Sequence, residues 1–393
     1  MKYSKFLCAL FALSTPAIAG INFDTPQGSL KLYGDVEFNV DAASKTGQLT
    51  SLRTNSGKDW NAGNSERWDV NGRILIGLDG YRTTTNNQFA GFSVQPLADL
   101  SGEMNLDDAA FFFGQEKDWK IKVGRYEAYD MFPLNQDTLI EYSGNTANNL
   151  YDDGFGYIYM MKEARGRSSA GGAVQFSKIS GPFYFELNTF ASNGTKLFQD
   201  SEFHGNTLEN KKNVVYLRPV IAYNISDDIT AAIAMETNVV SNAYGYTDAN
   251  GVFHDQSERT GYGATLTWNG QKNNPDNGVV LNMSTAYLDA SDEKDFSAGA
   301  NALWNDIELG YIYAKNDVQA FNFSNTDVDN MDGVILGKYD IHTVHTSYRI
   351  RNIMEMDNFD IYLGAYWSRL TMDNSQHDDK DRYGARVRFK YHF

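Results

Sequence analysis

The sequence predicts an all-β fold: a single transmembrane barrel of antiparallel strands. Three observations lead to this prediction. Many segments alternate apolar and polar residues, most clearly at the C-terminus. Beyond residues 1–19, no apolar run is long enough for a membrane-spanning helix, so a membrane span would have to be made of strands. The 24 Tyr and 24 Phe against 7 Pro suit strands and the aromatic girdles of a membrane barrel.

The last predicted strand runs from Tyr383 to Phe393. Its residues divide between two faces because successive side chains of a strand point in opposite directions. A strand of a soluble sandwich would rarely place four cations on one face without a water-filled space beside them, so we expect one face to meet lipid and the other water. The apolar or small face holds Tyr383, Ala385, Val387, Phe389, Tyr391 and Phe393, and the polar face holds Gly384, Arg386, Arg388, Lys390 and His392.

The remaining strands follow the same alternation. Residues 30–40 and 70–78 are the clearest, with Val36 and Ile74 on apolar faces and Tyr33 and Arg73 on polar ones. A pass along the chain finds about seventeen candidate strands, with short connections at one end and longer ones at the other. Bacterial single-chain barrels close with an even number of strands, so we predict sixteen, with eighteen as the alternative.

The N-terminus has the features of a secretory signal peptide. Lys2 and Lys5 precede the apolar run Phe6 to Leu13, and Ala17-Ile18-Ala19 supplies a small-x-small cleavage site. Eight apolar residues cannot span about 30 Å of hydrocarbon, which argues against an anchor. We therefore expect residues 1–19 to be removed and residues 20–393 to form one domain.

Charge and cysteine content exclude several classes of function. The net charge is −16 and becomes more negative when Lys2 and Lys5 are removed. Nucleic acid is not an expected partner, because neutralising phosphates requires clustered cations. Cys8 is the only cysteine and lies in the predicted signal peptide, so the mature chain has no thiol for disulfides or catalysis.

A long segment from Tyr126 to Asp153 follows the predicted strand that ends in Val123-Gly124-Arg125. It is too long for a periplasmic turn, and loops of this length usually have a function. Acids and aromatic residues are mixed along it, and Ala164-Arg165-Gly166-Arg167 leads into the next strand.

Several short segments resemble outer-membrane porins of Gram-negative bacteria. The C-terminal strand ending in Phe393 resembles the assembly signal of outer-membrane barrels, and Leu32-Tyr33-Gly34 resembles the first porin strand. The segments 123–126 and 141–147 with Arg165 and Arg167 are similar to the third loop of trimeric porins, which folds into the lumen. Residues 125–134 and 137–139 are most similar to sugar-transporting glycoporins of the raffinose-porin type.

This resemblance implies a homotrimeric channel in the cell outer membrane, in contact with lipid and lipopolysaccharide. Small hydrophilic solutes, preferentially oligosaccharides, would diffuse through it. A general, non-specific porin is the alternative. A sugar offers apolar C–H faces and hydroxyl edges, so a pore that favours it needs aromatic rings beside charged hydrogen-bonding groups.

The residues expected to do this come from the loop and the barrel wall. The same arginines could simply hold the loop on the wall, and Tyr126, Tyr129 and Phe132 could pack within the loop. The expected acids of the constriction are Asp130, Asp137 and Glu141, and the expected basic wall is Arg73, Arg125, Arg165, Arg167, Arg386 and Arg388. The candidate sugar-stacking rings are Tyr33, Tyr126, Tyr129, Phe132 and Tyr184, and the expected assembly signal is Phe389, Tyr391 and Phe393.

Signals for an enzyme or a metal site are weak. His342 and His345 would point to opposite faces of a strand, which disfavours chelation. Residues 327–333 partly resemble a calcium loop, but Met331 occupies a position that needs oxygen. His345 with Ser347 is a weak candidate for a lipase pair. We expect no catalytic residue, metal or cofactor, and an adhesin-type barrel with a closed lumen is a further alternative.

Overall fold

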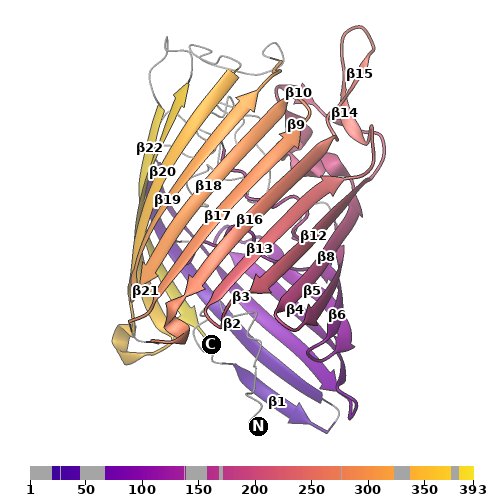
Figure 1. Cartoon of the computed structure of the whole chain (residues 1–393). Coiled ribbons are helices and arrows are strands. Elements are labelled where there is room, and N and C mark those ends of the chain that lie inside the picture. Colours follow the sequence, from indigo (N-terminus) through magenta and orange to yellow (C-terminus); the bar gives the residue numbers. More distant parts are fainter. Residues whose placement is uncertain are drawn as a thin grey trace.

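The structure, a computed structural model, describes residues 20–26, 28–44, 67–136, 138, 157–167, 171–275, 277–322, 337–372 and 380–393. Within these residues, sixteen antiparallel strands form a closed barrel (Figure 1). The prediction of sixteen strands is confirmed. The strands are β2 (Gly28–Ala43), β3 (Arg67–Thr83), β4 (Gln88–Asp99), β5 (Met104–Gln115), β6 (Trp119–Arg125), β7 (Ala173–Ser180), β8 (Phe183–Ser192), β12 (Val214–Asn224), β13 (Ile229–Asn238), β16 (Arg259–Asn269), β17 (Val279–Ala290), β18 (Glu293–Trp304), β19 (Ile307–Val318), β20 (Gly337–Ile350), β21 (Phe359–Met372) and β22 (Lys380–His392).

Pairing of β2 with β22 closes the barrel, from Asp35 opposite His392 to Ala43 opposite Gly384. The C-terminal residue extends this ladder, because Phe393 and Gly34 exchange backbone hydrogen bonds of 2.8 and 3.0 Å. The Phe393 ring lies against Gly34, where a Cβ atom would come within 2.5 Å of it. Below this point, the short strand β1 (Ile21–Thr25) pairs with the start of β2.

The two ends of the barrel differ in their connections. At the end that holds the C-terminus the connections are short, for example 84–87, 181–182 and 305–306. The opposite end carries long ones, including 44–66, 126–172 and 193–213. In outer-membrane barrels the short turns are periplasmic and the long loops extracellular, which orients this chain.

The long connections contain small elements of their own. The hairpin of β14 and β15 rises above the rim (Figure 1). These elements, with the short turns of helix, are β9 (Glu202–Phe203), β10 (Asn206–Thr207), β11 (Glu209–Asn210), β14 (Tyr244–Thr247), β15 (Phe253–Asp255), η1 (Gly194–Leu197), η2 (Gln199–Ser201), η3 (Gly270–Lys272) and η5 (Ile353–Glu355).

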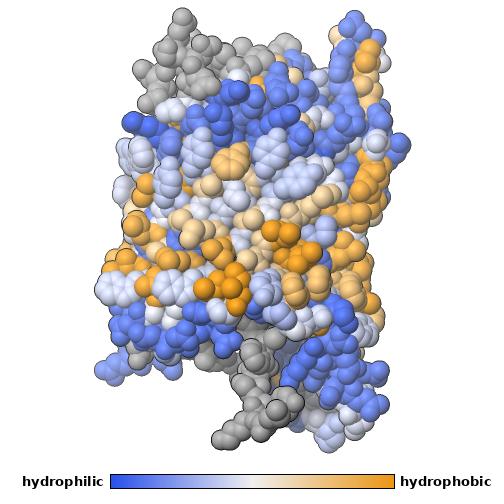
Figure 2. Space-filling model, viewed as in Figure 1, coloured by the Kyte–Doolittle hydropathy of each residue, from blue (hydrophilic) through white to orange (hydrophobic). Residues whose placement is uncertain are grey.

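The outer face of the barrel is apolar, as the alternation predicts. On the face that Figure 2 shows, a hydrophobic band crosses the middle of the molecule between hydrophilic ends. Among its exposed side chains are Ile74, Phe185, Leu266 and Phe389. None of the helical segments in the described residues has the length and apolar character needed to cross a membrane.

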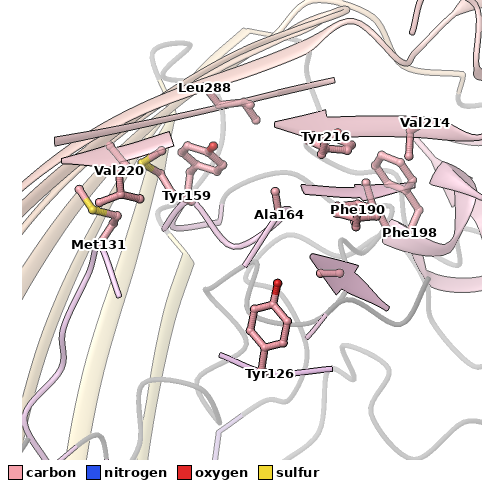
Figure 3. Close-up of a cluster of buried hydrophobic side chains, with 14 of the residues drawn as sticks. Tyr126, Met131, Tyr159, Ala164, Phe190, Phe198, Val214, Tyr216, Val220 and Leu288 are labelled. Carbon is pink, nitrogen blue, oxygen red and sulfur yellow. The ribbon is translucent and has the colours of Figure 1, made fainter. Parts of the chain in front are cut away.

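Two groups of buried apolar side chains lie on the inner side, between the wall and the segments that enter from the third loop. The larger group includes Tyr126, Tyr159 and Tyr216 (Figure 3). The smaller one joins Phe132 and Ile158 to Ile341. The interior is therefore packed along part of its wall.

Candidate functional site

The inner face of the closing strands carries paired charges. Arg386 of β22 donates from Nε and Nη2 to the two carboxylate oxygens of Asp41 of β2, at 2.6 and 2.8 Å. Arg388 Nη2 lies 3.3 Å from Glu37 Oε1, and Lys390 Nζ lies 3.4 Å from Glu37 Oε2. We expected Arg386 and Arg388 to face acids of the third loop, but acids of the neighbouring strand pair with them here.

Arg73 of β3 belongs to the same charged strip. Its Nη2 atom lies 3.6 Å from Asp35 Oδ1 of β2, so the acids of β2 lie between the cations of β3 and β22. Asp35, Glu37 and Asp41 were not among the site residues expected from the sequence. The sequence could have indicated them, because these three acids are two and four residues apart and therefore lie on the same, inward face of the strand.

The third loop begins and ends in an ionic cluster. Glu127 lies 3.5 Å from Arg165 and 3.2 Å from Arg167, measured between carboxylate oxygens and Nη1 atoms. Burial raises the pKa of Glu127, but the two guanidinium groups outweigh it and hold this pKa below its ordinary value. Arg167 also lies 3.3 Å from Asp107 and 2.8 Å from Asp108. The cluster joins the two stems of the loop.

Strands β5 and β6 carry charged residues beside the entry of the loop. Asp107 and Asp108 lie within β5. Arg125 donates to the backbone carbonyls of Leu106, Asp107 and Arg167. Its described hydrogen bonds hold backbone at the loop entry.

The first described part of the loop, residues 126–136 and 138, passes along the inner wall. Its anchors come from four strands, met in the same order along the loop as around the barrel, so it follows the circumference. In order along the loop, Arg218 of β12 donates to Tyr129 O, Asn301 of β18 donates to Pro133 O, Gln136 N donates to Glu308 of β19, and Arg386 of β22 donates to Thr138 O.

The second described stretch, residues 157–167, returns along the same wall. Tyr157 Oη donates to Asp295 of β18 at 2.7 Å, and Tyr159 Oη donates to Glu236 of β13 at 2.5 Å. Glu163 pairs with Arg259 of β16. Residues 139–156, which connect the two stretches, lie outside the described residues.

Glycines on the inner face make room for these stretches. A Cβ atom at Gly261 would lie 1.8 Å from Tyr159 Oη, and one at Gly263 would lie 2.1 Å from the Met161 sulfur. On β18, a Cβ at Gly299 would come within 2.9 Å of the Phe132 ring. Inward glycines on β16 and β18 were the sequence signal for the place where the loop packs, and no prediction made use of it.

The candidate sugar-stacking rings differ in how far they are exposed. Tyr126 is 0% exposed and Phe132 is 2% exposed, so neither offers a ring face to a solute. Those two predictions are corrected: the rings pack against the wall. Tyr33 is nearly buried against Gly77 and holds Asp79 and Gln95 through its hydroxyl.

Tyr129 and Tyr184 meet at the inner wall. Their ring centroids are 5.9 Å apart and the rings are tilted by 30°. Glu186 of β8 fixes both, because Oε1 accepts from Tyr129 N at 3.0 Å and Oε2 from Tyr184 Oη at 2.6 Å. Tyr184 is nearly buried and Tyr129 half-buried, so Tyr129 presents the accessible ring.

The acids expected at the constriction are described only in part. Asp130 Oδ1 accepts a hydrogen bond from Phe132 N at 2.9 Å, a local turn interaction. Asp137 and Glu141 lie outside the described residues, as does the calcium-like segment 327–333.

The weak enzyme candidates do not form a site. His342 points outward and its Nδ1 atom lies 2.7 Å from Tyr311 Oη, whereas His345 is buried on the inner face. Ser347 also faces inward and donates to Gln136 of the third loop. The predicted separation of the two histidines is confirmed, and Ser347 lies away from any lipid boundary.

Comparisons with known proteins identify the family. A family model described as porin-like glycoporin RafY matches residues 32–393. The chain belongs to this family. No curated protein matches the sequence of this porin.

Solved structures similar to this porin are also outer-membrane proteins. One is OmpF of Salmonella typhi in complex with daunomycin, with a TM-score of 0.57 and 13% identity; the match covers 95% of this chain and 100% of that chain. Another is OprB of Pseudomonas putida at high pH, with a TM-score of 0.54 and 10% identity; the match covers 92% of this chain and 94% of that chain. A third is a loop-deletion mutant of OmpT from Vibrio cholerae, with a TM-score of 0.52 and 12% identity; the match covers 93% of this chain and 100% of that chain. At these identities, the likeness supports the barrel fold alone.

The family and the fold together establish the general activity. This porin is a β-barrel channel of the outer membrane through which solutes diffuse. Proteins of this family and fold are channels and not enzymes.

Proposed function

We propose that this porin passes small hydrophilic solutes and favours oligosaccharides. The observation that carries the proposal is the half-buried ring of Tyr129, held on Tyr184 by Glu186 at the inner wall. An aromatic ring in a polar passage offers a surface for the C–H face of a sugar. The family description, a glycoporin, supports the same substrate class.

The charged strip of β2, β3 and β22 supplies the second requirement. Arg388 and Lys390 face Glu37 across the two strands, so opposite charges lie side by side on the wall. Such pairs exchange hydrogen bonds with hydroxyl groups as a sugar replaces its hydration shell. Each contact is weak, and transport requires this, because the solute must leave as readily as it enters.

Part of the proposal concerns the constriction. Asp130, with Asp137 and Glu141, would narrow the pore from the loop side, opposite Arg73, Arg386 and Arg388. The contacts of residues 126–138 with the inner wall support a third loop that lies in the lumen.

Planar-bilayer recordings with added sugars test the substrate class. We expect raffinose or sucrose to block the ionic current in a saturable manner, and Tyr129→Ala to weaken the block about tenfold, the loss of about 1.4 kcal/mol of stacking. Tyr129→Phe is the matched control, since it keeps the ring. A block that depends only on solute size, equal in all three proteins, would leave a general porin.

Assembly and processing belong to the same proposal. We infer a homotrimer embedded in lipid and lipopolysaccharide, and the OmpT structure described as a trimer form supports the oligomer by analogy (TM-score 0.50, 11% identity). Light scattering in detergent measures the oligomer. The intact mass of the exported protein shows whether residues 1–19 are removed, and outer-membrane assembly of Phe393→Ala tests the terminal signal.

A further inference from the structure

A cavity of about 260 Å³ opens among the loops at the extracellular end, and one of its lining residues, Phe321, packs against the cluster that holds Phe132 and Ile158 of the third loop. Four connections that are distant in sequence build it: 193–213, 239–258, 291–292 and the described start of 319–336. The lining residues are His204, Asn206, Tyr246, Gln256, Asp292, Ala320, Phe321 and Asn322.

Hydrogen bonds between these connections hold the cavity in shape. Asn322 N donates to His204 O at 2.8 Å, and Asn322 Nδ2 donates to Asn206 Oδ1 at 3.1 Å. On the other side, Gln256 Nε2 donates to Asp292 Oδ2 at 2.8 Å. Gly205 allows the closest approach, because it has φ +72° and a Cβ there would lie 2.1 Å from Asn322 O. These contacts fix the walls of the cavity in the absence of a ligand.

His204, one of the lining residues, carries an unsatisfied polar group. It is 3% exposed, its Nε2 atom lies 3.1 Å from Glu293 Oε2, and its Nδ1 atom has no hydrogen-bond partner within the described part of the chain. Burial, reinforced by Arg259, lowers the pKa of His204 to about 3, so the ring is neutral at pH 7. A neutral imidazole has one acceptor nitrogen, and a buried acceptor without a partner favours a ligand that donates.

The lining chemistry matches an uncharged polyhydroxylated molecule. Tyr246 and Phe321 offer ring surface, and the amides of Asn206, Gln256 and Asn322 offer both donors and acceptors. One carboxylate, Asp292, and no cationic side chain appear among the lining residues that the structure describes. This set disfavours an anion, and its amides and rings differ from the several carboxylates that a divalent cation prefers.

We propose that this extracellular pocket binds a single sugar unit of an oligosaccharide and captures it before it enters the pore. The inference rests on the proposed function for its ligand class, but it assigns a second site outside the barrel lumen. Such a site raises the concentration of sugar at the mouth of the channel.

Saturation-transfer NMR with raffinose and sucrose on the folded full-length protein in detergent tests the pocket. We expect both sugars to bind, and Tyr246→Ala and Asp292→Asn each to weaken binding by at least tenfold. Asp292 has φ +61°, a conformation that Asn tolerates, so this variant keeps the turn while removing the charge. Val252→Ala, at the exposed tip of the same hairpin as Tyr246, is the control and should bind as the parent does.

The outcomes separate the two proposals. Binding lost in Tyr246→Ala and Asp292→Asn but kept in Tyr129→Ala supports the pocket, whatever the channel recordings give. Sugar binding that is equal in the parent and both pocket variants overturns it, as does binding that is lost only in Tyr129→Ala. Saturable current block that is sensitive to Tyr129 then still supports the proposed pore function.

Discussion

Glu163 of the third loop and Arg259 of β16 form an ion pair inside the barrel, with Glu163 Oε1 2.7 Å from Nη2 and 2.8 Å from Nε of the guanidinium. Both side chains are at most 2% exposed. The other carboxylate oxygen accepts a hydrogen bond from Tyr216 Oη at 2.8 Å. The return stretch of the loop is thereby fixed to the wall by a carboxylate whose partners are all on the barrel.

Removing this carboxylate should loosen the loop. Glu163→Gln removes the carboxylate that pairs with the buried Arg259, and we expect the free energy of unfolding to fall by about 3 kcal/mol, because breaking a buried ion pair is costly. Urea unfolding of the detergent-solubilised barrel measures it. Glu209→Gln changes an exposed loop pair with Lys211 and should leave the unfolding midpoint unchanged. Equal midpoints for all three proteins would contradict the anchoring role of Glu163.

The third loop packs so closely on Gly261 of β16 that this position should not tolerate a larger side chain. We expect Gly261→Ala to displace Tyr159, since the new Cβ would lie 1.8 Å from its hydroxyl, and to break the Tyr159 bond to Glu236. Single-channel recording should show a noisier current of altered amplitude. Gly172→Ala is the control, because its Cβ would meet its nearest neighbour at 3.5 Å, an ordinary contact. A quiet, unchanged current from Gly261→Ala would show that residues 157–167 do not affect the pore.

The acids of the third loop should set ion selectivity. We expect Asp130→Asn with Asp137→Asn and Glu141→Gln to shift the preference of the channel from cations toward anions, because the wall cations would then act with less opposition. Asn at position 130 can still accept the hydrogen bond from Phe132 N, so the turn is kept. The reversal potential in a salt gradient measures the shift. An unchanged potential would remove these acids from the constriction.

The stems of the third loop should separate in acid. The folded pKa of Glu127 lies below its ordinary value, so its pairs with Arg165 and Arg167 stabilise the fold fully above that ordinary value, about pH 4.3. That stabilisation is lost as the pH falls from there through the lower folded pKa. We expect the parent to unfold at a higher temperature than Glu127→Gln at pH 7, with the difference vanishing in strong acid. A difference that stays constant with pH would indicate a packing effect.

The barrel was predictable because its signal is local. A strand with one face on lipid and one on water repeats every two residues. Residues 30–40 and 383–393 follow this period, and 70–78 follow it except at Leu75. The positions of Arg386 and Arg388 on the inner face followed directly. Their partners did not, because Asp41 and Glu37 meet them only through closure of the barrel, which pairs the first and last of its strands.

The path of the third loop was not predictable for a similar reason. Its anchors, among them Asn301, Glu236 and Arg218, are ordinary inward polar residues on separate strands, and no spacing in the sequence distinguishes them from residues that face water. Tyr126 and Phe132 were candidates for rings that line the pore, because residue type alone does not show whether a ring is buried. Only the inward glycines, such as Gly261 and Gly299, carried a readable signal of what packs over them.

The hydrogen bonds between Gly34 and Phe393 lie where the first and last strands of the barrel meet, so they form only when the barrel closes. Each interior strand can find a partner as soon as its neighbour in sequence is present, but β2 finds its second partner only when β22 arrives. A chain that ended before β22 would keep two open edges, and unpaired backbone groups are not tolerated in hydrocarbon. Pairing of β22 with β2 is therefore the step that leaves the barrel without an open edge in the membrane.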